Sequence, residues 1–277
     1  MTMNSNIDLT KLQSQIEDAY AKAELNGSDI ECVQTAIELL DKGVLKTAEK
    51  QNGEWKANQW VKQAILLYFK TQKMGLIESG DINFFDKIPL KKWTGNEGVR
   101  VVPHALVRRG AYIASGAILM PSYVNIGASV GPGTMVDTWA TVGSCAQVGS
   151  NVHLSGGVGI GGVLEPLQAT PVIVEDNAFI GSRCIVVEGL IIEEGAVLGA
   201  GVTLTASTKI LDVSQKEVKV YQGRVPKNSV VIPGSLPKEF PAGTYQVNCA
   251  LIIGQRKEST NKKTSLNDAL REYSVSV

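Results

Sequence analysis

Aliphatic residues recur at every sixth position through the middle of this chain, and this spacing constrains the fold more than any other feature. Eighteen residues follow the pattern, in three runs from Val101 to Leu119, from Val124 to Ile160 and from Val174 to Ile210. A unit of six residues holds one short strand and one corner, so three units close a triangular coil. Coils stacked about 4.8 Å apart align the aliphatic residues into one apolar column. The period predicts a parallel β-helix, about 29 Å tall if six coils stack.

The residues that directly follow the aliphatic positions are often small or turn-forming. Gly131, Asp137, Gly143 and Gly149 are examples, and Gly161 and Gly181 continue the series. Glycine and aspartate tolerate unusual backbone angles and sharp bends. We therefore expect these positions to form the corners of the coil.

The six-residue register is interrupted twice. The step from Leu119 to Val124 is five residues, a slip that one corner can absorb. The step from Ile160 to Val174 is fourteen residues and contains glycines and prolines, which predicts a loop outside the coil. Loops on rigid scaffolds often carry function, although a surface insertion without a role is the alternative.

The period divides the chain into three predicted domains. Residues 1–98 are expected to be helical, with a capping box of Ser28 and Glu31, a stop at Gly43 and a second helix that begins near Asn58. Residues 99–211 form the predicted β-helix. Residues 212–277 are expected to hold a hairpin or excursion at 212–219, short strands at 229–232 and 245–253 bounded by Pro233, Pro237 and Pro241, and a short helix at 264–273. The basic residues before that helix either meet a phosphate or form a solvated linker.

Composition excludes several classes of function. The net charge is zero and the isoelectric point is near 6.7, so no overall field favours nucleic acid or a membrane surface. No run reaches 18 apolar residues, and the first residues lack a basic stretch followed by an apolar one, which predicts a cytoplasmic protein. The four cysteines form no CxxC pair and are expected to be small buried residues. With only two histidines, the chain lacks the three-histidine zinc site of carbonic anhydrases built on this repeat, and no metal is expected.

Several segments carry residues that the six-residue period does not require. These are VVP at 101–103, LMPSYVNIG at 119–127, GTMVDTWATVGSCAQ at 133–147 and NVHLSGGVGIGGVLEPLQ at 151–168. They resemble the tetrahydrodipicolinate N-succinyltransferase family of hexapeptide-repeat acyltransferases, and weaker similarity covers nearly the full chain. The resemblance implies a left-handed coil and transfer of succinyl from succinyl-CoA to 2-amino-6-oxopimelate, the ring-opened tetrahydrodipicolinate, in diaminopimelate and lysine synthesis. It also implies a cytoplasmic homotrimer with small-molecule substrates and sites between subunits.

The implied reaction is the attack of an amine on a thioester, which needs a base, donors for the oxyanion and cations for carboxylates. The resemblance assigns Arg100 to substrate binding, where a guanidinium clamps a carboxylate. It assigns Asp137 to the substrate ammonium and to general-base catalysis, although an aspartate at a corner is usually a solvated turn residue. An ordinary carboxylate is a weak base for an amine, so this role requires partial burial or an amine that is already partly neutral.

Other site residues have weaker support. The backbone N–H of Ser144, or those of the glycine-rich stretch 156–162, are candidates for the oxyanion, although coil corners explain the same glycines equally well. Gly161, Gly162 and Arg224 are candidates for binding the coenzyme, while Arg108, Arg109 and Arg183 are further possible clamps. His153 is either a base, as in other acyltransferases on this scaffold, or a structural residue, and His104 is not expected to be catalytic.

One position departs from the family pattern. Where the family reads Gly-Ala-Arg-Ser-Glu, this chain has Gly181-Ser182-Arg183-Cys184-Ile185, so Ile185 replaces a proposed site carboxylate. Either that carboxylate is dispensable, or Glu165 or Glu188 substitutes for it, or the acceptor has changed. A related N-acetyltransferase with a different amino acid acceptor therefore remains an alternative, as does a non-catalytic β-helical scaffold.

Overall fold

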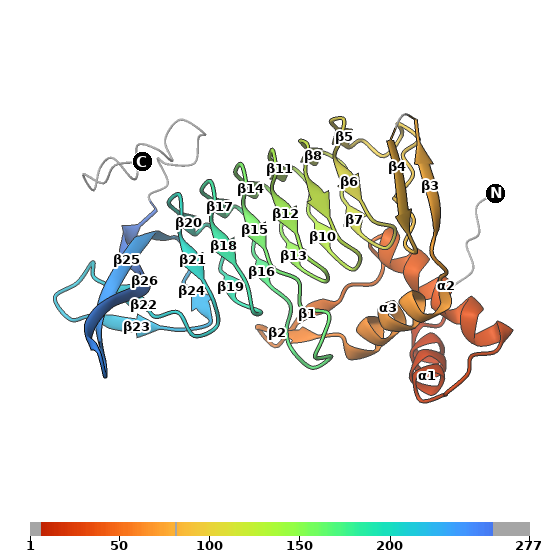
Figure 1. Cartoon of the computed structure of the whole chain (residues 1–277), viewed down its shortest axis with the longest axis horizontal. Coiled ribbons are helices and arrows are strands. Elements are labelled where there is room, and N and C mark those ends of the chain that lie inside the picture. The colour runs from red at the N-terminus through yellow and green to blue at the C-terminus, as the bar shows by residue number, and fades with distance from the viewer. Residues whose placement is uncertain (1–6, 81, 257–277) are drawn as a thin grey trace.

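The computed structural model describes residues 7–80 and 82–256, and its centre is a three-sided coil of short parallel strands. Over most of the coil, each strand pairs with the strand three places further along the chain, so successive strands belong to three sheets in turn (Figure 1). This arrangement is a parallel β-helix, as the six-residue period predicts. The structure is mainly β, with three helices in the described residues gathered at the N-terminal end.

We number the three faces in the order of successive strands along the coil, beginning with the face that contains Tyr112–Ile113. Sheet 1 contains β7 (Tyr112–Ile113), β10 (Ser129–Val130), β13 (Gln147–Val148), β16 (Ile173–Val174), β19 (Ile191–Ile192) and β24 (Arg224–Val225). Sheet 2 contains β5 (Arg100–Val101), β8 (Ile118–Leu119), β11 (Met135–Val136), β14 (His153–Leu154), β17 (Phe179–Ile180) and β20 (Val197–Leu198). It is continued by β25 (Ser229–Phe240), β26 (Gly243–Gln255), β22 (Ile210–Asp212) and β23 (Lys219–Tyr221). Sheet 3 contains β6 (Leu106–Val107), β9 (Tyr123–Val124), β12 (Thr141–Val142), β15 (Gly159–Ile160), β18 (Ile185–Val186) and β21 (Thr203–Leu204).

The aliphatic residues of the repeat form the interior column. All eighteen lie in the short strands, and the pairings stack them directly, as in Val136 on Leu154 and Leu154 on Ile180. Those from Val107 onward are buried in one hydrophobic core, against which Val101 packs half-buried. The five-residue step is absorbed at the corner between β8 and β9, and the fourteen-residue step leaves the coil as a loop between β15 and β16. The sequence prediction of both interruptions is confirmed.

The glycines that follow the aliphatic positions are required for a different reason from the one expected. Gly131, Gly143, Gly161 and Gly181 do not have positive φ. A Cβ on Gly143 would lie 2.2 Å from the backbone nitrogen of Gly162, and one on Gly131 would lie 2.4 Å from the Gly149 carbonyl oxygen. These glycines therefore provide room for the next coil, while the left-handed corner residues lie two positions further on, as at Gly133.

The N-terminal unit combines helices and hairpins. Helices α1 (Leu9–Tyr20), α2 (Gly27–Asp41) and α3 (Gln59–Thr71) pack together, with hairpins β1 (Ala48–Gln51)–β2 (Glu54–Ala57) and β3 (Gly75–Ser79)–β4 (Ile82–Asp86). The expectation of an entirely helical segment was wrong, because the Asn52-Gly53 turn, with φ of 51° and 86°, folds two short polar strands. The cap of α2 also differs, since Asn26 and Asp29 form the capping box in place of Ser28 and Glu31. The stop at Gly43, with φ of 74°, and the start after Asn58 are confirmed.

The N-terminal unit is fixed to the coil by buried polar contacts. Thr47 is fully buried, its Oγ1 donates to the Cys145 carbonyl at 2.7 Å, and Gln147 Nε2 donates to Thr47 Oγ1 at 2.8 Å. Lys62 of α3 is buried under the 161–172 loop and donates to the Ala169 carbonyl at 2.6 Å. Burial lowers the pKa of Lys62. The loop is therefore anchored to the helices instead of extending into solvent.

Parallel pairing continues after the repeat ends. β22 (Ile210–Asp212) and β23 (Lys219–Tyr221) form the antiparallel hairpin expected at 212–219. β24 then pairs in parallel with β19, and β25 (Ser229–Phe240) starts in parallel with β20 before it turns antiparallel to β26 (Gly243–Gln255). These strands are longer than expected, and Pro233 and Pro237, the expected strand ends, lie inside β25. The division at residues 98 and 211 stays a prediction, and the expected helix at 264–273 with its basic residues lies outside the described residues.

Candidate functional site

Asp137 lies at the corner between sheets 2 and 3, and the coil places His153 beside it. One coil separates their strands, since Met135 pairs with His153, and His153 Nε2 lies 3.9 Å from Asp137 Oδ2. Asp137 Oδ1 accepts a hydrogen bond from the Thr138 backbone N–H at 2.6 Å. The carboxylate is partly buried, with 31% of its side chain exposed.

His153 is held in place by stacking on Phe179. Their ring centroids are 5.2 Å apart and the rings are nearly parallel at 11°. Because Phe179 occupies the next rung of sheet 2, the imidazole is fixed against the sheet and only 24% of its side chain is exposed. The sequence reasoning missed the contact of His153 with Asp137. The signal was present, since three six-residue units make one coil and residues about 18 apart become neighbours.

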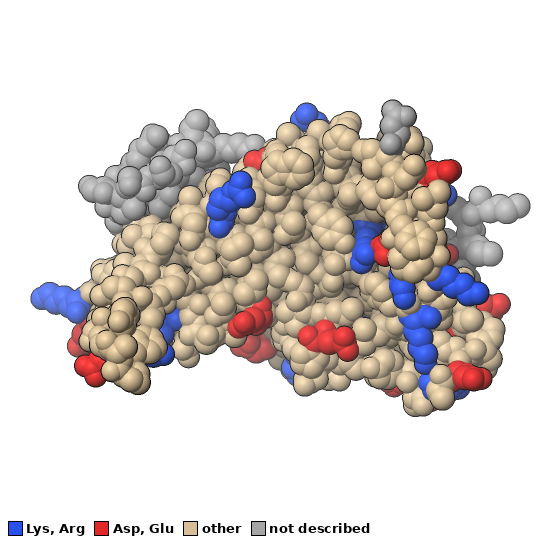
Figure 2. All heavy atoms as spheres, in the orientation of Figure 1, with Lys and Arg blue, Asp and Glu red and all other residues tan. Residues whose placement is uncertain are grey.

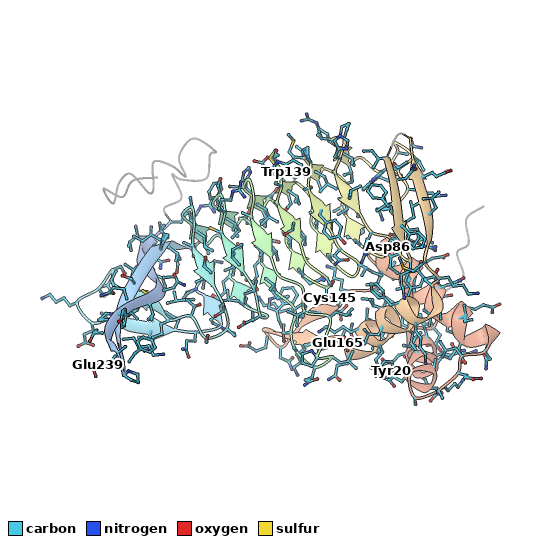
Figure 3. The ribbon with its side chains drawn as sticks, viewed as in Figure 1. Tyr20, Asp86, Trp139, Cys145, Glu165 and Glu239 are labelled. Carbon is cyan, nitrogen blue, oxygen red and sulfur yellow. The ribbon has the colours of Figure 1, made fainter. Side chains whose placement is uncertain are left out.

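The same corner carries an exposed aromatic ring and an unpaired guanidinium. Trp139 has positive φ and is 69% exposed, and Figure 3 places it at the side of the coil away from helices α1–α3. One rung further, Gly157 has no side chain, and Arg183 lies across it, with its Cδ 2.7 Å from where a Cβ would be. Arg183 has no ion-pair partner among the described residues. It is therefore available to a carboxylate or a phosphate.

Arg100 is on the first rung of sheet 2, whereas Asp137 directly follows the third rung. β5 pairs with β8, and β8 pairs with β11, so Arg100 and Met135 are two rungs apart, about 10 Å. The Arg100 side chain is exposed. The structure places Arg100 and Asp137 at different rungs, without direct contact between them.

Ser144 and the two predicted coenzyme glycines lie at a different corner, between sheets 3 and 1. Gly162 packs on the Ser144 backbone, because a Cβ there would lie 2.7 Å from the Ser144 nitrogen. Neither of these two backbone N–H groups donates to another described residue. Gly161 instead donates to the Val186 carbonyl at 2.8 Å. Ser144 and Gly162 therefore present two free donors that can stabilise an oxyanion.

The remaining arginine candidates are already paired. Arg224 contacts Glu54 at 3.1 Å and Glu193 at 3.3 Å, on sheet 1. Arg108 contacts Asp86 at 2.6 Å, and Arg109 lies 3.5 Å from Glu38. The pairs with Glu54, Asp86 and Glu38 join the N-terminal unit to the coil. A single chain thus does not bring together Asp137, Ser144 and Arg224, which lie at three separate places around the coil.

The Ile185 position lies on the outer face of sheet 3, where its side chain is 36% exposed. Neither of the two glutamates considered as substitutes lies on the strand that carries Ile185. Glu165 is exposed in the 161–172 loop, at the side that the helices cover in Figure 3, and Glu188 accepts from the Ala206 backbone N–H at 3.1 Å. Within this chain the outer face of sheet 3 remains apolar at residue 185.

The cysteines are free thiols in the structure. Cys145, Cys184 and Cys249 are buried as expected, whereas Cys32 is only half-buried. Burial raises the pKa of Cys145 to about 12 and that of Cys184 to about 11. Among residues 7–80 and 82–256, no three His, Cys, Asp or Glu side chains are grouped as metal ligands, and no helix has the length and apolar character to cross a bilayer.

The sequence is similar to one named family over nearly its full length. Residues 11–71 match the family described as tetrahydrodipicolinate N-succinyltransferase N-terminal, and residues 171–206 match the hexapeptide repeat of succinyl-transferase. The 2,3,4,5-tetrahydropyridine-2,6-dicarboxylate N-succinyltransferase of Acinetobacter baylyi is 52% identical, over 95% of this chain and 99% of the relative. The protein of that name from Sodalis glossinidius is 51% identical over the same shares.

A solved structure shares the fold at lower sequence similarity. The crystal structure of a putative 2,3,4,5-tetrahydropyridine-2-carboxylate N-succinyltransferase from Campylobacter jejuni superposes with a TM-score of 0.53. The identity is 19%, and the match covers 91% of this chain and 72% of the other. This likeness supports the architecture of the chain.

Proposed function

The chain belongs to the tetrahydrodipicolinate N-succinyltransferase family, and from this membership we propose that it transfers succinyl from succinyl-CoA to the amine of 2-amino-6-oxopimelate. The observation that carries the proposal is about 50% identity to N-succinyltransferases over nearly the whole of both chains. The reaction would serve diaminopimelate and lysine synthesis. Succinyl-CoA is the cosubstrate that this reaction requires.

Asp137 is the proposed general base. Its Oδ1 is occupied by the Thr138 N–H, so Oδ2 is the oxygen that accepts a proton from the attacking amine. His153 lies 3.9 Å from that oxygen and is fixed by Phe179, so it limits the orientations that the carboxylate adopts. As the amine nitrogen bonds to the thioester carbon, its proton passes to Asp137, the carbonyl oxygen becomes an oxyanion, and collapse of the adduct expels the CoA thiolate.

Ser144 and Gly162 are proposed to stabilise that oxyanion through their free N–H groups. In one chain they lie across sheet 3 from Asp137. A homotrimer with sites between adjacent β-helices would place the corner after sheet 2 of one subunit against the corner after sheet 3 of another. The separation of these residues in the single chain supports such an assembly, with Arg100 and Asp137 binding the acceptor.

Further features of the proposal rest on family membership. We propose a left-handed coil, a homotrimer and a cytoplasmic location. Gly161 and Gly162 are proposed to line the coenzyme site, where their lack of side chains allows close approach. Arg224 is proposed to bind the coenzyme only by exchanging its contacts with Glu54 and Glu193.

The test is an acyl-transfer assay with purified full chain, tetrahydrodipicolinate and either succinyl-CoA or acetyl-CoA, with release of CoA as the readout. We expect turnover with succinyl-CoA, and a loss of at least about 100-fold in kcat for Asp137→Asn, because the amide cannot accept the proton. Asp18→Asn, an exposed aspartate on α1, is the matched control and should leave the rate unchanged.

The possible results separate the alternatives. Preference for acetyl-CoA would contradict the succinyl assignment and favour the N-acetyltransferase that Ile185 suggests. No turnover with either donor would indicate a changed acceptor or a scaffold. Full activity in Asp137→Asn would remove this residue from the base role.

A further inference from the structure

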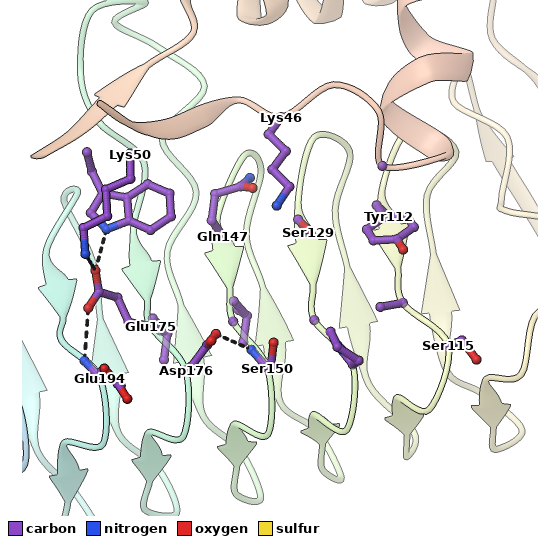
Figure 4. Close-up of a pocket in the computed structure, with 18 residues that line it drawn as sticks. Lys46, Lys50, Tyr112, Ser115, Ser129, Gln147, Ser150, Glu175, Asp176 and Glu194 are labelled. Carbon is purple, nitrogen blue, oxygen red and sulfur yellow. Dashed lines mark hydrogen bonds and ion pairs between the residues drawn. The ribbon is translucent and has the colours of Figure 1, made fainter. Parts of the chain in front are cut away.

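A long groove in the described residues lies on the outer face of sheet 1. It has a volume of about 800 Å³, within the range of small-molecule sites. Sheet 1 forms its floor, and the segment from Gly43 to Lys50 crosses above it (Figure 4). Tyr112 closes one end, where its ring packs directly under Gly43, and Trp55 lies at the other end. The groove is therefore a bounded channel under the N-terminal unit.

Most charges at the Trp55 end are satisfied within the chain. Glu175 accepts from Lys50 Nζ at 2.8 Å, from Trp55 Nε1 at 2.7 Å and from the Glu194 backbone N–H at 3.1 Å. Burial by itself would raise the pKa of Glu175, but these hydrogen bonds lower it, so the group is ionised and paired. Glu194 pairs with Lys227 at 2.8 Å. These groups form the end wall and are not free to bind a charged ligand.

Two charged groups in the groove remain unpaired. Lys46 belongs to the crossing segment, and its side chain points into the groove between Gln147 and Ser129 (Figure 4). Its ammonium has no ion-pair or hydrogen-bond partner among the described residues. Asp176 accepts from the Ser150 backbone N–H through Oδ1, at 2.7 Å, and has no cationic partner in the described residues. One positive and one negative group thus face the same channel at different positions.

Polar atoms on the floor beneath Lys46 are also unused. Ser129 is buried, and its hydroxyl forms no hydrogen bond with a described residue. Gln147 directs its amide nitrogen to Thr47 and to backbone carbonyls, which leaves its amide oxygen as a free acceptor. A carboxylate between Lys46 and Ser129 would receive two donors, and an adjacent ammonium would donate to Gln147. This combination matches the head group of an α-amino acid.

The rungs of the coil set the length of a ligand that reaches both charges. Ser129 lies on β10, Gln147 on β13 and Asp176 just after β16, so two rungs, about 10 Å, separate the first from the last. An amino acid with an extended side chain and a terminal amine, together with a hydrogen bond at each end, covers such a span. An anion without this second charge would leave Asp176 unpaired.

From this arrangement we propose that the groove binds a basic amino acid, with its carboxylate on Lys46 and Ser129, its α-ammonium on Gln147 and its terminal amine on Asp176. The site is distinct from the proposed catalytic residue, because the groove lies on sheet 1 and Asp137 lies at the corner between sheets 2 and 3. The proposal therefore does not depend on the proposed function.

The test is calorimetric titration of the full chain with L-lysine. We expect saturable binding that weakens at least about tenfold in Lys46→Met and in Asp176→Asn, since each removes one charge while it keeps the length or shape of the side chain. Lys56→Met, an exposed lysine on β2 outside the groove, is the matched control and should bind as the parent does. L-Norleucine, without the terminal amine, and cadaverine, without the carboxylate, should each bind at least about tenfold more weakly than L-lysine.

Several results would overturn the proposal. They are the absence of saturable L-lysine binding, equal affinity for L-norleucine, or unchanged affinity in both groove variants. Loss of binding in Asp137→Asn with full binding in Lys46→Met would instead place the ligand at the catalytic corner. Circular dichroism of each variant, matched to the parent, shows that a loss of affinity is not a loss of fold.

Discussion

The interior of the β-helix consists of one residue class repeated on every rung, whereas the junction between coil and N-terminal unit depends on a few dissimilar polar side chains. The column from Val107 to Ile252 is aliphatic with alanines between the strands, and each layer supports its neighbours. At the junction, Thr47, Gln147 and Lys62 each appear once, and each satisfies particular backbone carbonyls. The stability of the column is therefore distributed over many equivalent residues, whereas that of the junction depends on a few hydrogen bonds.

The largest effect is expected inside the column. Leu154→Ala removes three buried carbons at the centre of the coil, between Val136 and Ile180, and should lower the free energy of unfolding by about 2–5 kcal/mol. Urea denaturation followed by circular dichroism measures it. Ile185→Ala, on the exposed outer face of sheet 3, is the control and should cost less than about 1 kcal/mol. Equal costs would mean that the column is not the main source of stability.

A smaller effect is expected at the junction. Thr47→Val keeps the shape of the side chain but removes the hydroxyl between the Cys145 carbonyl and the Gln147 amide, at a cost of about 1–3 kcal/mol. Thr35→Val, on the exposed side of α2, is the matched control and should fall within about 0.5 kcal/mol of the parent. A Thr47 variant as stable as the control would show that Gln147 alone holds the junction.

The smallest effect concerns the ion-paired end of the groove and depends on pH. Hydrogen bonds lower the pKa of Glu175 in the folded protein. The ionised carboxylate therefore contributes its full stabilisation above the pKa of the unfolded chain, about 4.3, and this stabilisation disappears as the pH falls through the pKa of the folded protein. Glu175→Gln should therefore be less stable than the parent at pH 7, by up to about 1 kcal/mol, because Lys50 is half exposed.

This difference should shrink as the pH is lowered from 5 towards 3, and thermal unfolding at several pH values measures it. Glu49→Gln, an exposed neighbour on β1, should show no such trend. A constant difference across this range would mean that the hydrogen bonds of Glu175 do not depend on its charge.

The same contrast explains what could be predicted from the sequence. The column and both interruptions follow from period alone, because each six-residue unit obeys one packing rule. The positions of the corner glycines were predicted correctly, but the reason for glycine was not. A side chain there would collide with the backbone of the next coil, and this contact cannot be seen from the residues of one coil alone. Hairpin β1–β2 was missed because its strands are polar, although Asn52-Gly53 is a hairpin signal.

The site was predictable only in part. Asp137 and Arg100 are proposed from the resemblance, and the structure places Arg100 on the first rung of sheet 2 and Asp137 directly after its third. Lys46 carried no signal, because an isolated lysine before a short strand is an ordinary surface residue. Its proposed role rests on the crossing of its segment over sheet 1, which the sequence does not show. In Figure 2 the face of the coil turned to the viewer carries few charged residues, so charge patterning offered little guidance.

The two ends of the coil bear on how the protein avoids growing into fibres. A stack of parallel rungs ends in unpaired backbone groups that can recruit another copy, as in amyloid. Here Trp93 packs at the first rungs, and at the last rungs Ala250 and Ile252 of β26 enter the column from a strand that runs antiparallel to β25. Strand polarity therefore changes at the last rungs, and a large aromatic side chain covers the core at the other end. We expect both features to disfavour the addition of a second coil.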